Sequence, residues 1–191
     1  MSAFELYLKL GFWHITDWAG YDHMLFLLAL CGAYSFAEWR KVALLVTAFT
    51  LGHSLTLALT AMDVIRVNAN LIEFLIPLTI FLTAMGTIFH SKAATNRYWT
   101  LSYVLALAFG LIHGMGFSNY FRSLLGNAND VIAPLLYFNI GVEIGQLAIV
   151  AAILLIGWVM RDPLRVPPKW WRIGISVIAG VIAIWLMVER I

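Results

Sequence analysis

The chain has 191 residues, of which 62% are hydrophobic and 12% charged, and its formal net charge is +2. An ordinary soluble domain is about 45–50% apolar and about 25% charged, so this composition excludes a soluble globular protein. The basic residues sit between apolar stretches, so no nucleic-acid partner is expected. With a mean hydropathy of +0.89, the chain is expected to be an all-α integral membrane protein in contact with a lipid bilayer.

Residues 1–20 are expected to form a short interfacial or re-entrant segment, because Trp13 and Trp18 suit the surface of the bilayer. Glu5 precedes Lys9 in this segment, unlike the basic region of a cleavable signal peptide, so the N-terminus is expected to be retained.

The remaining chain is divided into long apolar runs, which favour helices over the alternating strands of a barrel. Each transmembrane helix needs about 20 mostly apolar residues. The sequence therefore predicts a single transmembrane domain, residues 1–191, that forms a polytopic bundle of about six transmembrane helices. The predicted spans are 21–36, 40–62, 71–90, 98–120, 131–160 and 171–188.

The lysines and arginines between these spans predict the orientation. Eight fall on one side of the membrane: Arg40, Lys41, Lys92, Arg97, Arg161, Arg165, Lys169 and Arg172. Four fall on the other side: Lys9, Arg66, Arg122 and Arg190. The positive-inside rule then places both termini outside the cytoplasm.

Several polar residues lie within or at the ends of the predicted spans. They are Asp22, His23, His53, Glu73, His113, Asn139, Glu143 and Gln146. Ionisable groups in hydrocarbon cost about 2.5–3.5 kcal/mol each on insertion scales, so they are first interpreted as functional. Counted at about 1.5 Å per residue from the outer end of each span, the depths run from roughly 5 Å for Asp22 and His23 to roughly 18 Å for Glu143. All lie in the outer half or near the midplane, which predicts one shared site.

Residue spacing supports this interpretation. One face of the fifth predicted span carries Asn139, Glu143 and Gln146, and one face of the second carries Thr50, His53 and Ser54. Two pairs of glycines have the spacing that allows close helix approach, namely Gly110 with Gly114 and Gly141 with Gly145. Close approach would let imidazoles from different spans reach one ion.

Histidines with one or two carboxylates suit a borderline divalent metal such as Ni, Co, Zn, Fe or Cu, because imidazole is favoured by those metals. We therefore take His23, His53 and His113 as candidate ligands. Asp22 could also bind the metal, and Asp22 or Glu143 could instead accept an imidazole N–H.

Other interpretations stay open for the remaining polar residues. Asn139 and Gln146 also suit hydrogen bonds between helices. Glu73 could be a carboxylate stabilised by the dipole at the N-terminus of a helix. A purely structural hydrogen-bond network also remains open for the histidines themselves.

Five segments, in this order, resemble the HupE/UreJ membrane proteins and in particular their second branch. They are Gly11-Phe-Trp-His14-Ile15, Gly20-Tyr-Asp22-His23-Met-Leu-Phe26, Phe49-Thr50-Leu-Gly-His53-Ser54, Phe109-Gly110-Leu-Ile-His113-Gly114 and Phe138-Asn139-Ile-Gly141-Val-Glu143-Ile-Gly145-Gln146. Members are associated with hydrogenase and urease clusters and are described as nickel or cobalt permeases. The resemblance implies a link to metalloenzyme maturation, and we expect the inner (plasma) membrane of a bacterium.

Carried over by position, the resemblance implies a metal site made of His14, Asp22, His23, His53, His113 and Glu143. Thr50, Ser54, Glu73, Asn139 and Gln146 would then lie around the site or along a pathway. The family usually leaves five residues between its first histidine and the Asp-His pair, whereas Ile15 to Tyr21 make seven here.

Three functions remain in competition. The first is a transition-metal permease that captures a cation from the outer side and releases it inward. The second is an intramembrane metal-dependent enzyme of the hydrolase type, in which the metal activates a water molecule. The third is an accessory structural membrane protein whose histidines only bind neighbouring helices. The sequence leaves the oligomeric state open, a homo-oligomer included.

Overall fold

The computed structural model describes residues 2–89, 96–125 and 131–190. Within these residues the chain is helical and has no strand, which confirms the all-α fold. The helices are α1 (Ala3–Thr16), η1 (Trp18–Gly20), α2 (Tyr21–Cys31), η2 (Phe36–Glu38), α3 (Trp39–Ala61), α4 (Ala69–Phe89), α5 (Asn96–Leu125), α6 (Ile132–Arg161) and α7 (Pro168–Glu189).

Five apolar segments among the described residues are long enough to cross a membrane. They are Phe36–Ala61, Ala69–Phe89, Thr100–Leu125, Ile132–Arg161 and Pro168–Glu189. These correspond to the predicted spans from residue 40 onward, although the predicted end at His90 lies outside the described residues. The predicted span 21–36 is wrong, because α2 has only 11 residues and about 20 are needed.

The sequence after Cys31 explains why α2 is short. The backbone turns there, with the N–H of Tyr34 donating to the carbonyl of Cys31 at 3.0 Å. Ser35 then forms a capping box with Glu38, whose Oε2 accepts from the Ser35 N–H at 3.1 Å. A capping box marks the start of a new helix, so the chain enters η2 and α3 instead of extending α2.

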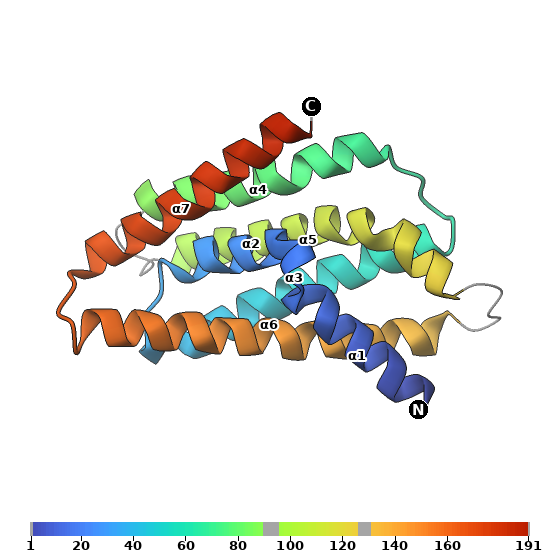
Figure 1. Ribbon diagram of the computed structural model, residues 1–191, viewed down its shortest axis with the longest axis horizontal. Coiled ribbons are helices and arrows are strands. Elements are labelled where there is room, and N and C mark those ends of the chain that lie inside the picture. Colours follow the sequence, from blue (N-terminus) through green and yellow to red (C-terminus); the bar gives the residue numbers. More distant parts are fainter. Residues whose placement is uncertain (1, 90–95, 126–130, 191) are drawn as a thin grey trace.

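Together α1 and α2 traverse the bundle as one broken span. In Figure 1, α1 enters from the end of the bundle where the α3–α4 connection lies, and α2 continues toward the opposite end, where α3 begins. The break is at residues 17–20, where Asp17 has extended backbone (φ −71°, ψ 134°). Irregular backbone at membrane depth is found where it is buried in protein or lines a site, as in the discontinuous helices of transporters.

Glycines bring the helices of the bundle close together. The most extensive contacts join α3 with α5, α1 with α6 and α4 with α7. On α5, a Cβ at Gly110 or Gly114 would collide with the backbone of Phe49 or His53 on α3. On α6, a Cβ at Gly141 would collide with the backbone of α1. The close approach predicted from the glycine spacing is therefore confirmed.

Candidate metal centre

Four of the five histidines meet at the break between α1 and α2. His14 ends α1, His23 begins α2, His53 lies on α3 and His113 on α5. The ring centroid of His23 lies 4.9 Å from that of His14, 5.2 Å from that of His113 and 6.1 Å from that of His53. Four helices therefore contribute to this histidine cluster, although the residues are spread over a hundred positions of the sequence.

The imidazoles of the cluster are withdrawn from the surface, and most of their nitrogens lack a hydrogen-bond partner. His23, His53 and His113 are 5%, 0% and 1% exposed, and His14 is half-buried. The buried nitrogens without a hydrogen-bond partner include Nε2 of all four rings and Nδ1 of His53. Buried polar atoms are nearly always satisfied in folded proteins, so nitrogens left over in this number call for a ligand.

The nitrogens are placed to share one ion. His14, His23 and His53 each offer one ligand atom, and these atoms all lie within 4.8 Å of one another. Nitrogens bound at about 2.0–2.1 Å from one ion lie at most about 4.2 Å apart, a separation close to that of these atoms. Imidazole donors suit Zn, Ni, Co, Fe or Cu, so the residues present fit a transition metal.

The orientation of the His113 ring makes it available as a further ligand. Its Nδ1 lies 2.9 Å from the carbonyl oxygen of Phe109. A carbonyl can only accept, so Nδ1 carries the proton and Nε2 keeps a lone pair. Such a backbone hydrogen bond fixes the tautomer of many metal-binding histidines.

The carboxylate of Asp22 contacts one histidine of the cluster. Its Oδ1 lies 2.9 Å from Nδ1 of His23 and accepts the backbone N–H of the same residue at 2.8 Å. Asp22 can therefore orient His23 or bind an ion directly. On α6, Asn139 donates to the Leu135 carbonyl at 2.9 Å, while its buried Oδ1 has no hydrogen-bond partner.

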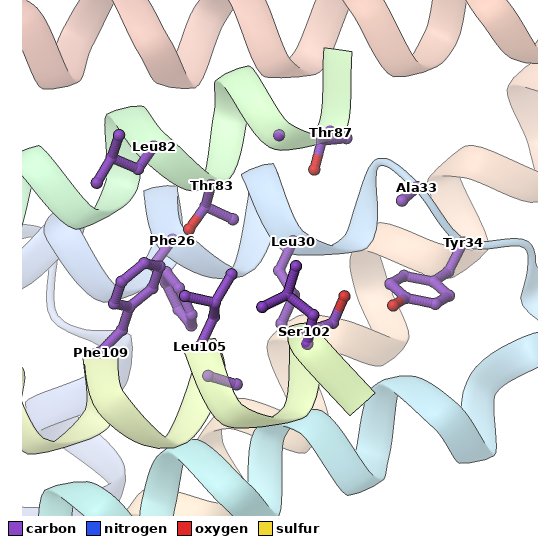
Figure 2. Close-up of a pocket in the computed structure, with 13 residues that line it drawn as sticks. Phe26, Leu30, Ala33, Tyr34, Leu82, Thr83, Thr87, Ser102, Leu105 and Phe109 are labelled. Carbon is purple, nitrogen blue, oxygen red and sulfur yellow. The ribbon is translucent and has the colours of Figure 1, made fainter. Parts of the chain in front are cut away.

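Aromatic side chains surround the histidines and separate them from an apolar cavity. The ring of Phe117 lies 3.8 Å from that of His14, and the ring of Phe26 lies 5.7 Å from that of His113. Phe26 and Phe109 also line a cavity of about 340 Å³ between α2, α4 and α5 (Figure 2). Figure 2 shows the two rings at one end of this cavity and Tyr34 at the other.

Glu143 makes its contacts one helical turn away from the cluster, between α6 and α3. Its Oε1 accepts from the Thr47 hydroxyl at 2.6 Å, and its Oε2 accepts from the Thr50 hydroxyl. Oε1 of Gln146 lies 2.7 Å from the same Thr50 hydroxyl. Glu143, Thr47, Thr50 and Gln146 are called the oxygen cluster below. Glu143 is absent from the group of described residues whose ligand atoms converge on one point.

The other two predicted residues, Ser54 and Glu73, make their contacts outside the histidine cluster. Ser54 donates to the Thr50 carbonyl at 2.6 Å and so binds its own helix. Glu73 is exposed near the start of α4, where it lines a cavity of about 520 Å³ together with Asp63, Arg66 and Arg122. In this cavity the Arg66 side chain, bonded to the Asp63 carboxylate, lowers the pKa of Asp63 below its ordinary value.

Two features differ from what the sequence analysis predicts. Asp22 and His23 were expected near the outer edge of the bilayer, but they lie at the level of His53 and His113, because α1 precedes them in the broken span. Thr47 was missed altogether. Its spacing of one helical turn from Thr50 is the signal that could have identified it.

Comparisons with known proteins agree with the membrane fold and with the resemblance described above. No curated protein and no solved structure matches the chain. A family model described as HupE / UreJ protein matches residues 1–190. The chain therefore belongs to the HupE/UreJ family of membrane proteins.

Proposed function

We propose that this chain is a permease for a divalent transition metal of the nickel or cobalt type, with the ion as its substrate. The observation that carries the proposal is the set of buried imidazole nitrogens without partners at the break between α1 and α2. In the proposal, His14, His23, His53 and His113 bind the ion and Asp22 supplies negative charge. Sites at broken helices are typical of transporters, because helix ends and unwound backbone at the break can face the substrate or ion.

The direction of transport follows from the predicted topology in a bacterial inner membrane. The end of the bundle that carries the N-terminus of α1, the α3–α4 connection and the C-terminus of α7 would face outward (Figure 1). From the histidine cluster, polar side chains continue along α3 and α6 toward the opposite end through Thr50, Glu143 and Thr47. These residues supply polar contacts beyond the outer half, which a pathway needs.

Uptake of Ni²⁺ and Co²⁺ by purified protein in proteoliposomes, followed with a metal-sensitive dye inside the vesicles, tests the permease. We expect uptake by the wild type and its loss in the double variant His53→Ala/His113→Ala. A matched control is Thr83→Val on α4, whose hydroxyl donates to the Thr79 carbonyl. Uptake that does not differ from empty vesicles would exclude a permease.

The apolar cavity favours a metal-dependent enzyme as the second candidate. A hydrocarbon chain in the cavity would end at Phe26, whose ring packs against His113 (Figure 2). In that reading, the metal would activate water for hydrolysis of a lipid. Release of a fatty acid from membrane lipid by the metal-loaded protein, without metal uptake, would support the enzyme over the permease.

A further inference from the structure

The oxygen cluster places one carboxylate between two membrane-spanning helices without a positive partner. Among residues 2–89, 96–125 and 131–190, no lysine, arginine or histidine forms an ion pair with Glu143. Glu143 follows the start of α6 by 11 residues, or about 16 Å along the helix axis. An unpaired charge at such depth is costly, so the carboxylate takes up a proton or pairs with a cation.

Among the described residues, the hydrogen-bond contacts of this carboxylate and of its neighbour Thr50 are made by oxygens. Thr47 and Thr50 present hydroxyl oxygens from α3, and Gln146 presents Oε1 from α6. The Thr50 hydroxyl has one proton but lies within hydrogen-bond distance of Glu143, Gln146 and the Val46 carbonyl. The cluster is therefore richer in acceptors than in donors.

Both threonines can turn their protons away from the carboxylate. The Thr47 hydroxyl lies 3.1 Å from the Ala43 carbonyl, and the Thr50 hydroxyl lies 3.1 Å from the Val46 carbonyl. With the protons directed at these carbonyls of their own helix, the hydroxyl lone pairs face Glu143. The cluster then offers a carboxylate, two hydroxyls and an amide oxygen to a cation.

Gln146 independently indicates a ligand at this place. Its side chain is 0% exposed, and its Nε2 has no hydrogen-bond partner. Its Oε1 is directed toward Thr50 at 2.7 Å. A fully buried amide rarely leaves a polar atom unsatisfied, so the Gln146 side chain indicates that a ligand is bound at the oxygen cluster.

We propose that Glu143, Thr47, Thr50 and Gln146 form a second cation-binding site, separate from the histidine cluster and selective for harder divalent ions. Oxygen ligands suit Mg²⁺, Ca²⁺ and Mn²⁺, and they bind Ni²⁺ or Co²⁺ more weakly than imidazoles do. Thr50 precedes His53 by three residues, about 4.5 Å along α3, so the two sites are one helical turn apart.

This arrangement gives the second site a role that rests on the proposed permease. A metal leaving the nitrogen ligands would next meet oxygen ligands that hold it less tightly. Thr47 is exposed and Glu143 half-buried, so the site is accessible at its end away from the histidines. The oxygen cluster would thus release the ion toward the inner end of the bundle.

Two metal probes distinguish the sites in purified protein. Mn²⁺ binding is measured from the loss of the free-ion electron paramagnetic resonance signal, and Ni²⁺ binding by calorimetry. We expect Glu143→Gln to weaken Mn²⁺ binding about 10-fold or more while changing Ni²⁺ affinity less than about 3-fold. His53→Ala should weaken Ni²⁺ binding about 10-fold or more and leave Mn²⁺ binding intact.

Thr50→Val keeps the shape of the side chain and serves as the second variant if Glu143→Gln does not fold. It should weaken Mn²⁺ binding, whereas the matched control Thr83→Val should not. Unchanged Mn²⁺ binding in Glu143→Gln or Thr50→Val would overturn the second site. It would also be overturned if Glu143→Gln and His53→Ala each weakened the binding of both Mn²⁺ and Ni²⁺. If the two sites separate as expected but proteoliposomes take up no metal, the second site stands and the permease fails.

Discussion

The rings of His14 and His23 lie 4.9 Å apart across the break between α1 and α2. The intervening residues leave the α-helical conformation at Asp17 and return to it at Tyr21. This short irregular segment joins the two half-helices. It brings His14 and His23 together beside His53 of α3 and His113 of α5. A continuous helix would place His14 and His23 about 13.5 Å apart along its axis.

Removal of either of two fully buried histidines should empty the site. We expect His53→Ala and His113→Ala each to abolish most binding of a divalent transition metal, because a neighbouring imidazole cannot replace a ligand fixed on a different helix. Metal content of the purified variants, measured by elemental analysis, gives the result. Folded variants with wild-type metal content would instead favour a structural hydrogen-bond network.

The contact between α3 and α5 should tolerate no side chain at Gly110. We expect Gly110→Ala to destabilise the protein by about 1–3 kcal/mol, because the new Cβ collides with the backbone of Phe49. Gly86→Ala on α4 is the matched control, since nothing lies within 4 Å of its added Cβ. Thermal unfolding in detergent compares the two, and equal melting temperatures would contradict the packing described for α3 and α5.

Both termini should face the outside of the cell. The basis is the split of basic residues, eight against four, between the two predicted sides of the membrane. Reporter fusions at the C-terminus, one active only in the cytoplasm and one only outside it, decide the orientation. A reporter active in the cytoplasm would reverse the proposed direction of transport.

The sequence analysis was most successful where one helix could be considered by itself. The long spans and the glycine contacts of Gly110 and Gly141 follow from apolar length and from spacing on a single helix. The single broken span of α1 and α2 was not predicted, because residues 1–20 were assigned to an interfacial segment and residues 21–36 to a separate span. Spacing places His23 on a helix face, but only packing against α1 sets its depth in the bundle.

Metal affinity should fall as the pH is lowered. Imidazoles bind metal only in their neutral form, so protons compete with the ion for the imidazole nitrogens of the cluster. We therefore expect the dissociation constant for Ni²⁺ to rise as the pH is lowered. Calorimetric titrations at several pH values measure the change, and a pH-independent affinity would argue against imidazole ligands.

X-ray absorption spectroscopy of the Ni²⁺- or Co²⁺-loaded protein tests most directly whether the histidines form the metal site. We predict one tightly bound ion per chain. Its spectrum should contain the outer-shell scattering of at least three imidazoles, which we assign to the histidines of the cluster, His14, His23, His53 and His113. Nitrogen ligands are expected at about 2.0–2.1 Å. A bound ion surrounded by oxygen ligands alone, or a spectrum unchanged in His53→Ala/His113→Ala, would contradict the assignment of this cluster as the metal centre.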